Sequence, residues 1–269
     1  MSNSMKMFPT TRSQLIKNLI YFSEKELPNY SKKRNFDFGP PHKNVSKISP
    51  YLRTRFITEE EVIKIAVSKN NIKTIEKFIE EIFWRTYWRG WLESHPLVYH
   101  DYLNISKCQP LLKKTGIKCF DHWKEELIDT GYLHNHSRMW FASIWIFTLD
   151  LPWQLGAEFF MQHLYDGDAA SNTLGWRWVA GVQTQGKHYL ASEWNIKKFT
   201  NNRFQNIKLN ENAPPKVSEK SYQIIKQNFN NSPNIENKNL LIFENNLSFE
   251  ITDFKDNNFK KIYLVTNSN

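Results

Sequence analysis

Apolar residues recur at helical spacing through most of this sequence, and this pattern constrains the fold more than any other feature. Within 71–95, Ile75, Phe78 and Ile82 lie three or four residues apart, which places them on one side of a helix. The alternation typical of strands is hard to find over residues 1–204. The sequence therefore predicts an all-α domain there. Other helices are expected at 11–30, after a capping box formed by Thr58 and Glu61, and at 119–130, 136–149 and 153–165, with a polar loop over 31–48 and irregular structure over 96–118.

The last part of the chain, residues 205–269, has a different character. It is rich in Asn, and the sequence APPK at 213–216 interrupts it. Two short apolar runs, one within 237–246 and one within 259–269, have the composition of strands. Because two short strands cannot bury a core alone, we expect this tail to lean on the helical domain or to be the remnant of a larger α/β module.

The composition narrows the kind of ligand. All ten tryptophans lie between Trp84 and Trp194, which suggests stacking against planar ligands or electron transfer, although indoles also fill protein cores. The formal net charge of +9 suits a polyanion such as nucleic acid, or it serves only to keep the surface solvated. Cys108 and Cys119 fit no zinc or disulfide spacing, so we expect two reduced thiols and no metal site.

The sequence also bears on location. No apolar run approaches the length of a transmembrane helix, and the first residues contain no apolar stretch typical of a secretory leader. We therefore expect a cytoplasmic protein that has no contact with a membrane.

Three short segments concentrate residues that could perform chemistry. DGDAASNTLGWRW at 166–178 has two carboxylates two residues apart, followed by an Asn and two tryptophans. YLHNHSRM at 132–139 leads into a predicted helix. EEIFWR at 80–85 places a Glu, a Trp and an Arg on one helix face, because they are three and four residues apart. Taken singly, the three segments are explained by a turn, a polar helix start and an ion pair along a helix.

Together, the three segments resemble the flavin-binding helical domain of the DNA photolyase/cryptochrome family. Three more matches occur in the family's order: YSKKRNF, which begins at Tyr30, SKISPYL at 46–52 and TG at 115–116. The resemblance covers about residues 13–190, which is most of the chain. It implies that residues 1–204 fold as a helical FAD-binding domain of this type.

The resemblance implies FAD as the cofactor and suggests its contacts. Arg138 would pair with Asp166 across the isoalloxazine ring, and Asp168 would accept a hydrogen bond from the imide edge of that ring. Asn172 would face the ring nitrogen that is protonated on reduction. An Asn at this position resembles photolyases, whereas plant cryptochromes typically carry Asp there and insect cryptochromes typically carry Cys. The other implied FAD contacts are Tyr30, Ser46 and Ser49 at the phosphates or ribose, and Arg85 and Asn135 near the flavin.

The resemblance also implies that the substrate is DNA containing pyrimidine dimers. Trp84 and Trp178 would sandwich a dimer that has flipped out of the duplex, since flipped bases are held by stacking and hydrogen bonds. Glu81 and Asn135 would supply the hydrogen bonds, and Met139 would line the same cavity.

Electron transfer and light capture show departures from the family pattern. Trp176 and Trp153 match the flavin-proximal and middle members of the family's tryptophan chain, but the distal position is Pro110. Val45 replaces one of two hydroxyl residues expected near the FAD phosphates. The family's N-terminal α/β antenna domain has no counterpart in this sequence, so we expect light to be absorbed by the flavin itself or by a separate antenna-like protein.

These observations favour one function and leave alternatives. The leading hypothesis is a deoxyribodipyrimidine photolyase, a carbon–carbon lyase that uses an electron from excited reduced FAD to split cyclobutane pyrimidine dimers. Glu81, Asn172, Trp176 and Trp153 would take part in the reaction. The main alternative is a cryptochrome-like FAD photoreceptor or a redox flavoprotein without repair activity. A nucleic-acid-binding scaffold without flavin and repair of the (6-4) lesion are further alternatives. We expect a monomer.

Overall fold

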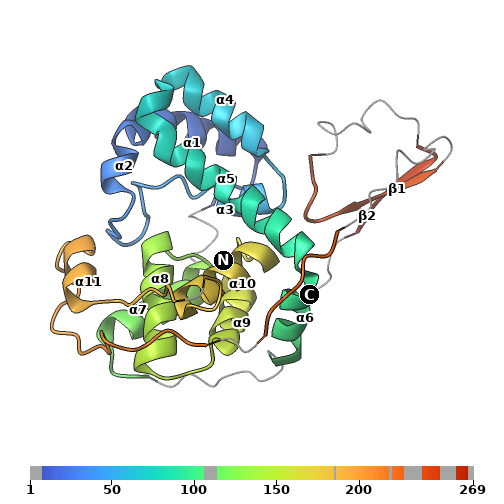
Figure 1. Ribbon diagram of the computed structural model, residues 1–269. Coiled ribbons are helices and arrows are strands. Elements are labelled where there is room, and N and C mark those ends of the chain that lie inside the picture. The colour runs from blue at the N-terminus through green and yellow to red at the C-terminus, as the bar shows by residue number, and fades with distance from the viewer. Residues whose placement is uncertain are drawn as a thin grey trace.

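Helices dominate the part of the chain that the computed structural model describes, which comprises residues 8–105, 114–184, 186–217, 220–226, 238–248 and 259–265 (Figure 1). This arrangement confirms the all-α prediction for the main domain. The elements are α1 (Arg12–Lys25), the 3-10 turn η2 (Leu27–Asn29), α2 (Tyr30–Lys33), α3 (Ser49–Arg53), α4 (Glu59–Lys69), α5 (Ile72–Ser94), α6 (Pro96–Ile105), α7 (Lys118–Thr130), α8 (Asn135–Ser143), the π-helical turn η3 (Ile144–Thr148), α9 (Trp153–His163), α10 (Ala169–Ala180), α11 (Glu193–Phe199), β1 (Asn239–Phe243) and β2 (Lys261–Val265).

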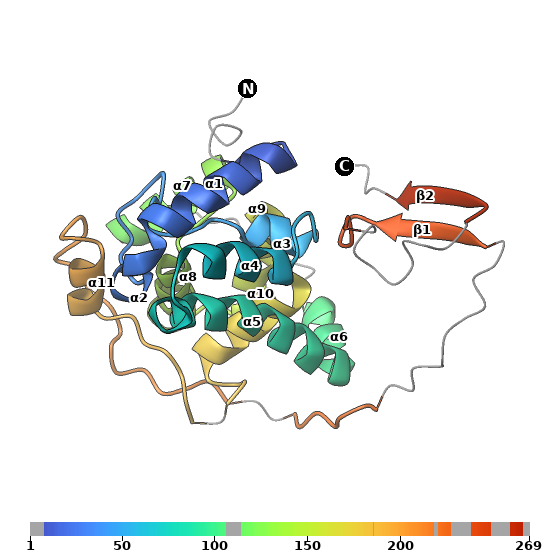
Figure 2. The same cartoon turned by 90° about the horizontal axis from the view of Figure 1, so that it is seen from above.

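The first group of helices packs around its own apolar core. It contains α1, α4 and the first half of α5, which lie together in Figures 1 and 2. The predicted capping box begins α4: the Thr58 side chain accepts from the backbone N–H of Glu61, while the Glu61 carboxylate accepts from the Thr58 N–H at 3.0 Å. These reciprocal bonds satisfy backbone donors that the first helical turn leaves free. Both this cap and the long helix expected over 71–95 are confirmed.

The second group, α6 to α10, surrounds a core rich in aromatic residues. Trp123, Trp140 and Trp145 are completely buried there, so these three indoles are core residues. Gly156 lets α9 approach α10 closely, because a Cβ at this position would lie 2.3 Å from the ring of Trp176. The long helix α5 crosses from the first group to pack on α10, and this contact connects the two groups.

Three local expectations are corrected by the structure. Residues 96–105 form α6 instead of an irregular segment: the helix begins at Pro96, whose fixed φ suits a first helical position, and Val98 and Tyr102 anchor it in the core. The helix expected over 11–30 ends at Lys25 and continues as η2 and α2. The helix expected over 136–149 changes from α8 into the π-helical turn η3.

The tail contains the two expected strands. They pair in parallel, with Leu241 opposite Tyr263, and much of their apolar surface is exposed. The tail also contacts the helical part, since the Leu247 N–H donates to the Thr54 carbonyl at 2.9 Å. Within the described residues, no helix combines the length and the apolar character needed to cross a bilayer. Cys119 is a buried free thiol, and Cys108 lies outside the described residues.

Candidate functional site

The centre of the candidate site is a pair of buried carboxylates at the start of α10. Asp166 lies in the loop before this helix, and one of its oxygens accepts from Arg138 of α8 at 2.9 Å. Arg138 is itself oriented by a 2.9 Å hydrogen bond to the Leu133 carbonyl. Burial alone would raise the pKa of Asp166, but Arg138 and a hydrogen bond from Ser49 outweigh it, so the pKa lies below its usual value. Asp166 is therefore a fixed anion.

Asp168 caps a helix and also pairs with two arginines. Its Oδ1 accepts from the Ser171 N–H at 2.9 Å and so caps α10. Its Oδ2 lies 3.5 Å from Nη1 of Arg85 and 2.8 Å from Nη2 of Arg89, and both arginines project from α5. Burial would raise the pKa of Asp168, but the two arginines outweigh this effect and lower it. The charge of Asp168 thus links α5 to α10.

Other residues that the sequence assigned to the cofactor surround this centre. Asn172 is buried one turn after Asp168, and its side-chain amide donates to the Ala157 carbonyl at 2.7 Å. This bond fixes the orientation of the amide and leaves its oxygen as an acceptor. Ser49 opens α3 and receives a long 3.4 Å hydrogen bond from Arg85 on its carbonyl.

Tyr30 and Ser46 belong to the first helical group and the loop within it. Tyr30 packs edge-on against Phe22 and Phe78, and burial raises its pKa to about 12. Its hydroxyl is therefore a neutral donor at physiological pH. Ser46 is half-buried in the loop before α3.

Three buried polar atoms of the residues assigned to the cofactor and to electron transfer have no hydrogen-bond partner among the described residues, although one of them, on Arg85, lies 3.5 Å from Asp168. They are Oδ1 of Asp166, Nη1 of Arg85 and Nε1 of Trp176. Leaving such groups unpaired costs free energy, so a site that collects two donors and an acceptor is suited to a polar ligand. A Cβ at Gly175, also on α10, would meet no atom within 4 Å. The residues present therefore fit a planar cofactor that carries both donors and acceptors, as a flavin does.

The residues assigned to a substrate lie at more accessible positions. Glu81 of α5 forms an ion pair with Arg34, which the sequence argument had not joined to it. Trp84, one turn further on, is 47% exposed and contacts Tyr87 and Trp88 at ring distances of 5.4 and 5.6 Å. An indole with an open face can stack on another planar group.

On the other side, α8 and α10 contribute three more of these residues. Asn135 is exposed at the first position of α8, and Met139 is half-buried one turn later. Trp178 stacks on Tyr189 with the ring centroids 5.9 Å apart. The residues assigned to the substrate thus come from three helices, α5, α8 and α10, and no hydrogen bond, ion pair or ring contact joins those of α5 to those of α8 and α10 among the described residues.

The two residues assigned to electron transfer are placed differently. Trp176 is buried beside Phe160, with the ring centroids 5.0 Å apart. Trp153 begins α9 and stacks on Tyr102 at 5.9 Å with nearly parallel rings. The hydroxyl of Tyr102 donates to Glu158 at 3.0 Å. Pro110 lies outside the described residues.

A buried polar network beneath α8 was missed by the sequence argument. Asp37, in the loop after α2, is completely buried and accepts from Ser137 of α8 at 2.8 Å. His42 connects it to Glu126 of α7, with its Nε2 2.8 Å from the Glu126 carboxylate. A signal existed in the sequence: Asp37 and His42 are polar residues in a short loop that follows directly on the predicted entry motif at Tyr30. The spacing did not reveal their partners.

Comparisons with known proteins point to one family. A family model described as the FAD binding domain of DNA photolyase matches residues 78–212, about half of the chain. The deoxyribodipyrimidine photo-lyase of Neurospora crassa is 27% identical over 208 residues, which cover 68% of this chain and 32% of that protein. The enzyme of the same name from Alkalihalophilus pseudofirmus is 30% identical over 187 residues, which cover 65% of this chain and 38% of that protein.

Solved structures show the same fold. A class III photolyase from Agrobacterium tumefaciens matches with a TM-score of 0.56 and 24% identity, over 70% of this chain and 42% of that one. A cryptochrome from Synechocystis matches with a TM-score of 0.58 and 20% identity, over 71% of this chain and 44% of that one. The chain thus spans less than half of the length of the proteins it matches.

Proposed function

Since the chain belongs to the family of FAD-binding domains of DNA photolyase, we propose that it repairs cyclobutane pyrimidine dimers in DNA with light. The observation that carries the proposal is the set of buried polar atoms on Asp166, Arg85 and Trp176 that lack a hydrogen-bond partner among the described residues. When bound, reduced FAD supplies the light-excited electron that splits the dimer.

Binding of the cofactor would rest on charge and shape. Arg138, held by Asp166, and Arg85, held by Asp168, would present their remaining N–H groups to the flavin. Asn172 would offer its amide oxygen, because the amide nitrogen is engaged with Ala157. Tyr30, Ser46 and Ser49 would donate to the phosphates or ribose, for which neutral hydroxyls are suitable donors.

Binding of the lesion would rest on stacking. Trp84 and Trp178 would each cover one face of the flipped dimer, with Met139 filling the space beside them. Asn135, exposed at the start of α8, would hydrogen-bond the pyrimidine edges. Glu81 would do the same after exchanging its bond with Arg34 for one with the lesion, which frees Arg34 to approach a DNA phosphate.

Buried Trp176 and half-buried Trp153 would carry electrons to the cofactor. Trp176 lies in the aromatic core beside Phe160, and Trp153 contacts Tyr102, which is hydrogen-bonded to Glu158. Oxidation of a tyrosine releases its proton, and Glu158 is positioned to receive it. This contact makes Tyr102 our candidate for the role that a distal tryptophan has in the family.

The test is a repair assay on the FAD-loaded protein. The protein is reduced, mixed with an oligonucleotide that contains one thymine dimer, and exposed to blue light while the ultraviolet absorbance of thymine is followed. Recovery of absorbance in the light and none in the dark is expected. Trp84→Ala should bind FAD normally but repair poorly, because the side chain is half exposed and its loss leaves the core intact.

One observation favours a second function. Glu81 faces Arg34 in an ion pair, so the hydrogen-bonding group for the lesion is engaged within the protein. A cryptochrome-like photoreceptor or redox flavoprotein would need no free group at this position. Bound FAD without recovery of thymine absorbance would favour this function over repair.

A further inference from the structure

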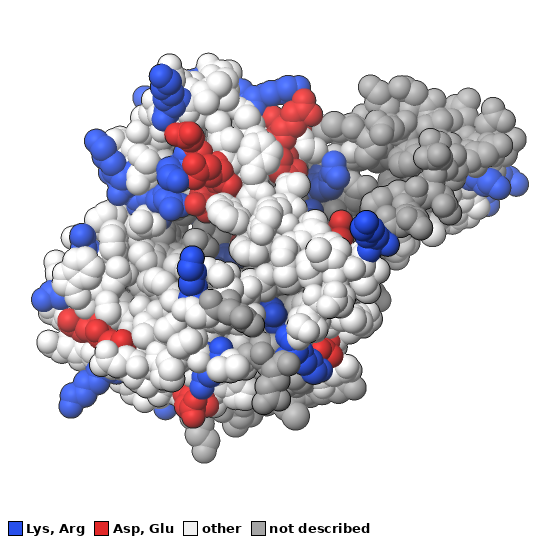
Figure 3. Space-filling model, in the orientation of Figure 1, with Lys and Arg blue, Asp and Glu red and all other residues white. Residues whose placement is uncertain are grey.

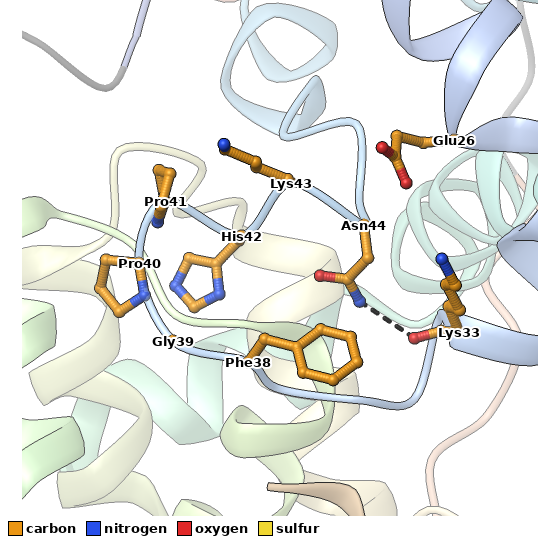
Figure 4. Close-up of a pocket in the computed structure, with 9 residues that line it drawn as sticks. All are labelled: Glu26, Lys33, Phe38, Gly39, Pro40, Pro41, His42, Lys43 and Asn44. Atoms are coloured by element: carbon orange, nitrogen blue, oxygen red, sulfur yellow. Dashed lines mark hydrogen bonds between the residues drawn. The ribbon is translucent and has the colours of Figure 1, made fainter. Parts of the chain in front are cut away.

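A cavity of about 300 Å³ lies outside the site described above, in the loop that joins α2 to α3 (Figure 4). Ligand pockets begin at about this size, so it can take a small ligand such as one nucleotide. The cavity adjoins the proposed lesion site through the backbone, because its lining residue Lys33 precedes Arg34, the partner of Glu81. The residues that line it are Glu26, Lys33, Phe38, Gly39, Pro40, Pro41, His42, Lys43 and Asn44.

The cavity combines three kinds of group. Lys33 and Lys43 supply positive charge, and neither forms an ion pair with a described residue; Glu26 is the acidic lining residue. Phe38 is 47% exposed and has one face covered by Phe36, whose ring is nearly parallel at 5.4 Å. An aromatic ring fixed from behind and open in front is suited to stacking on a base.

Asn44 supplies an acceptor with a fixed orientation. Its side-chain nitrogen donates to the carbonyls of Lys33 at 3.0 Å and Phe36 at 2.8 Å, which determines where the amide oxygen points. That oxygen is buried in a side chain only 5% exposed and accepts no hydrogen bond from the described residues. Figure 4 shows it directed inward, toward the space that the loop encloses. Buried acceptors in native structures are nearly always paired, so this oxygen is available to a donor group of a ligand.

The charge around the cavity also favours an anion. Basic side chains gather on the face shown in Figure 3 in the region of α2, and this helix ends with Lys32 and Lys33. The ammonium group of Lys47 donates to the Pro41 carbonyl at 2.6 Å, and burial and the charge of Lys43 lower its pKa. Two ammonium groups that repel each other are stabilised when an anion binds between or beside them.

We propose that this cavity binds one nucleotide of a DNA strand, with the phosphate at Lys33 and Lys43, the base on Phe38 and a base N–H group at the Asn44 oxygen. The inference rests on the proposed function in one respect, namely that the strand is the one that carries the lesion. A free nucleotide has the same chemistry and is distinguished by the test.

The test measures binding of undamaged single-stranded DNA by the full-length, FAD-loaded protein. Fluorescence anisotropy of a labelled oligonucleotide is recorded at several salt concentrations for the wild type, Lys33→Gln/Lys43→Gln and Phe38→Leu. Lys17→Gln/Lys73→Gln is the matched control, because it removes the same charge from exposed positions outside the cavity. Competition with thymidine monophosphate tests for a free nucleotide.

The expected result is specific to the cavity. The slope of log affinity against log salt should fall by about 0.7 in the Lys33→Gln/Lys43→Gln protein, as for one phosphate contact with a single strand, and not in the control. Phe38→Leu should weaken binding about fivefold or more at every salt concentration. If thymidine monophosphate competes with the oligonucleotide but the salt slope of the Lys33→Gln/Lys43→Gln protein is unchanged, the cavity binds free nucleotides instead.

Equal slopes in the cavity variant and the control, wild-type affinity in Phe38→Leu and no competition would overturn the proposal. Repair is scored separately. If wild-type protein repairs no dimer while the slopes still differ, the proposed function fails and the nucleotide site remains.

Discussion

Replacing Asp37 by Asn should destabilise the protein by about 2–4 kcal/mol, because it removes a completely buried carboxylate that accepts several hydrogen bonds and pairs with the partly exposed Arg203. Asp37 is completely buried; its Oδ2 lies 2.8 Å from Arg203 and accepts from Ser137 at 2.8 Å and from Trp123 at 3.3 Å. Its Oδ1 accepts from the Gly39 N–H at 2.8 Å. These four groups are all donors, and the His42 ring lies 3.4 Å from Oδ1. The NH₂ group of an asparagine would face donors in either orientation, and Arg203 would lose its counter-charge.

Urea unfolding monitored by tryptophan fluorescence measures this loss. With a slope of about 2–3 kcal/mol per molar urea, the midpoint should fall by about 1–2 M. Asp150→Asn is the matched control: Asp150 pairs with Lys216 at the same 2.8 Å, but its side chain is 83% exposed. Asn also tolerates the φ of 49° at this position. The control midpoint should hardly move, since exposed pairs contribute little. Equal shifts in the two variants would refute the argument from burial.

Acid provides a second check on Asp37. Burial would raise its pKa, but Arg203 and His42 outweigh this effect and lower it. A carboxylate with a lowered pKa stabilises the folded state fully above the ordinary Asp pKa of about 4, and this stabilisation is lost as the pH falls through the folded-state value. The stability difference between wild type and Asp37→Asn should therefore be constant near neutrality and shrink below about pH 4. A difference that grows on acidification would contradict the assigned direction.

Three further substitutions test the packing and the site. Gly156→Ala should lower the free energy of unfolding by about 1–3 kcal/mol, because its Cβ would meet the ring of Trp176 at 2.3 Å; thermal unfolding measures this, and an unchanged midpoint would contradict the close approach. Asp168→Asn keeps a residue that can cap α10 but removes the charge that holds Arg89, so FAD retention on a desalting column should fall on the order of tenfold while the helix content by circular dichroism stays the same. Thr58→Ala removes the cap of α4 and should cost about 1 kcal/mol in urea unfolding without changing FAD retention.

Local features of the fold were predictable because they depend on neighbours in the sequence. The capping box at Thr58 and the apolar face of α5 need only spacings of three and four residues, and the structure contains both. Helix α6 was missed because few of its residues are buried: Val98 and Tyr102 anchor it, and Leu97 and Leu103 are exposed. With apolar residues on both the buried and the exposed side, the periodic signal that identifies a helix is weak.

The electrostatics of the candidate site could not be obtained from spacing in the same way. The sequence argument placed Arg85 near the flavin, but Asp168 also contacts Arg89, which lies one turn further along α5. The charge of the site follows from this contact: three arginines, including Arg138, meet two carboxylates in a poorly hydrated space. An excess of positive charge in such surroundings favours an anionic ligand, because charge interactions are stronger away from bulk water. FAD is the anionic ligand in the proposed complex, so Arg89 adds to the attraction for the cofactor although the motif at 80–85 ends before it.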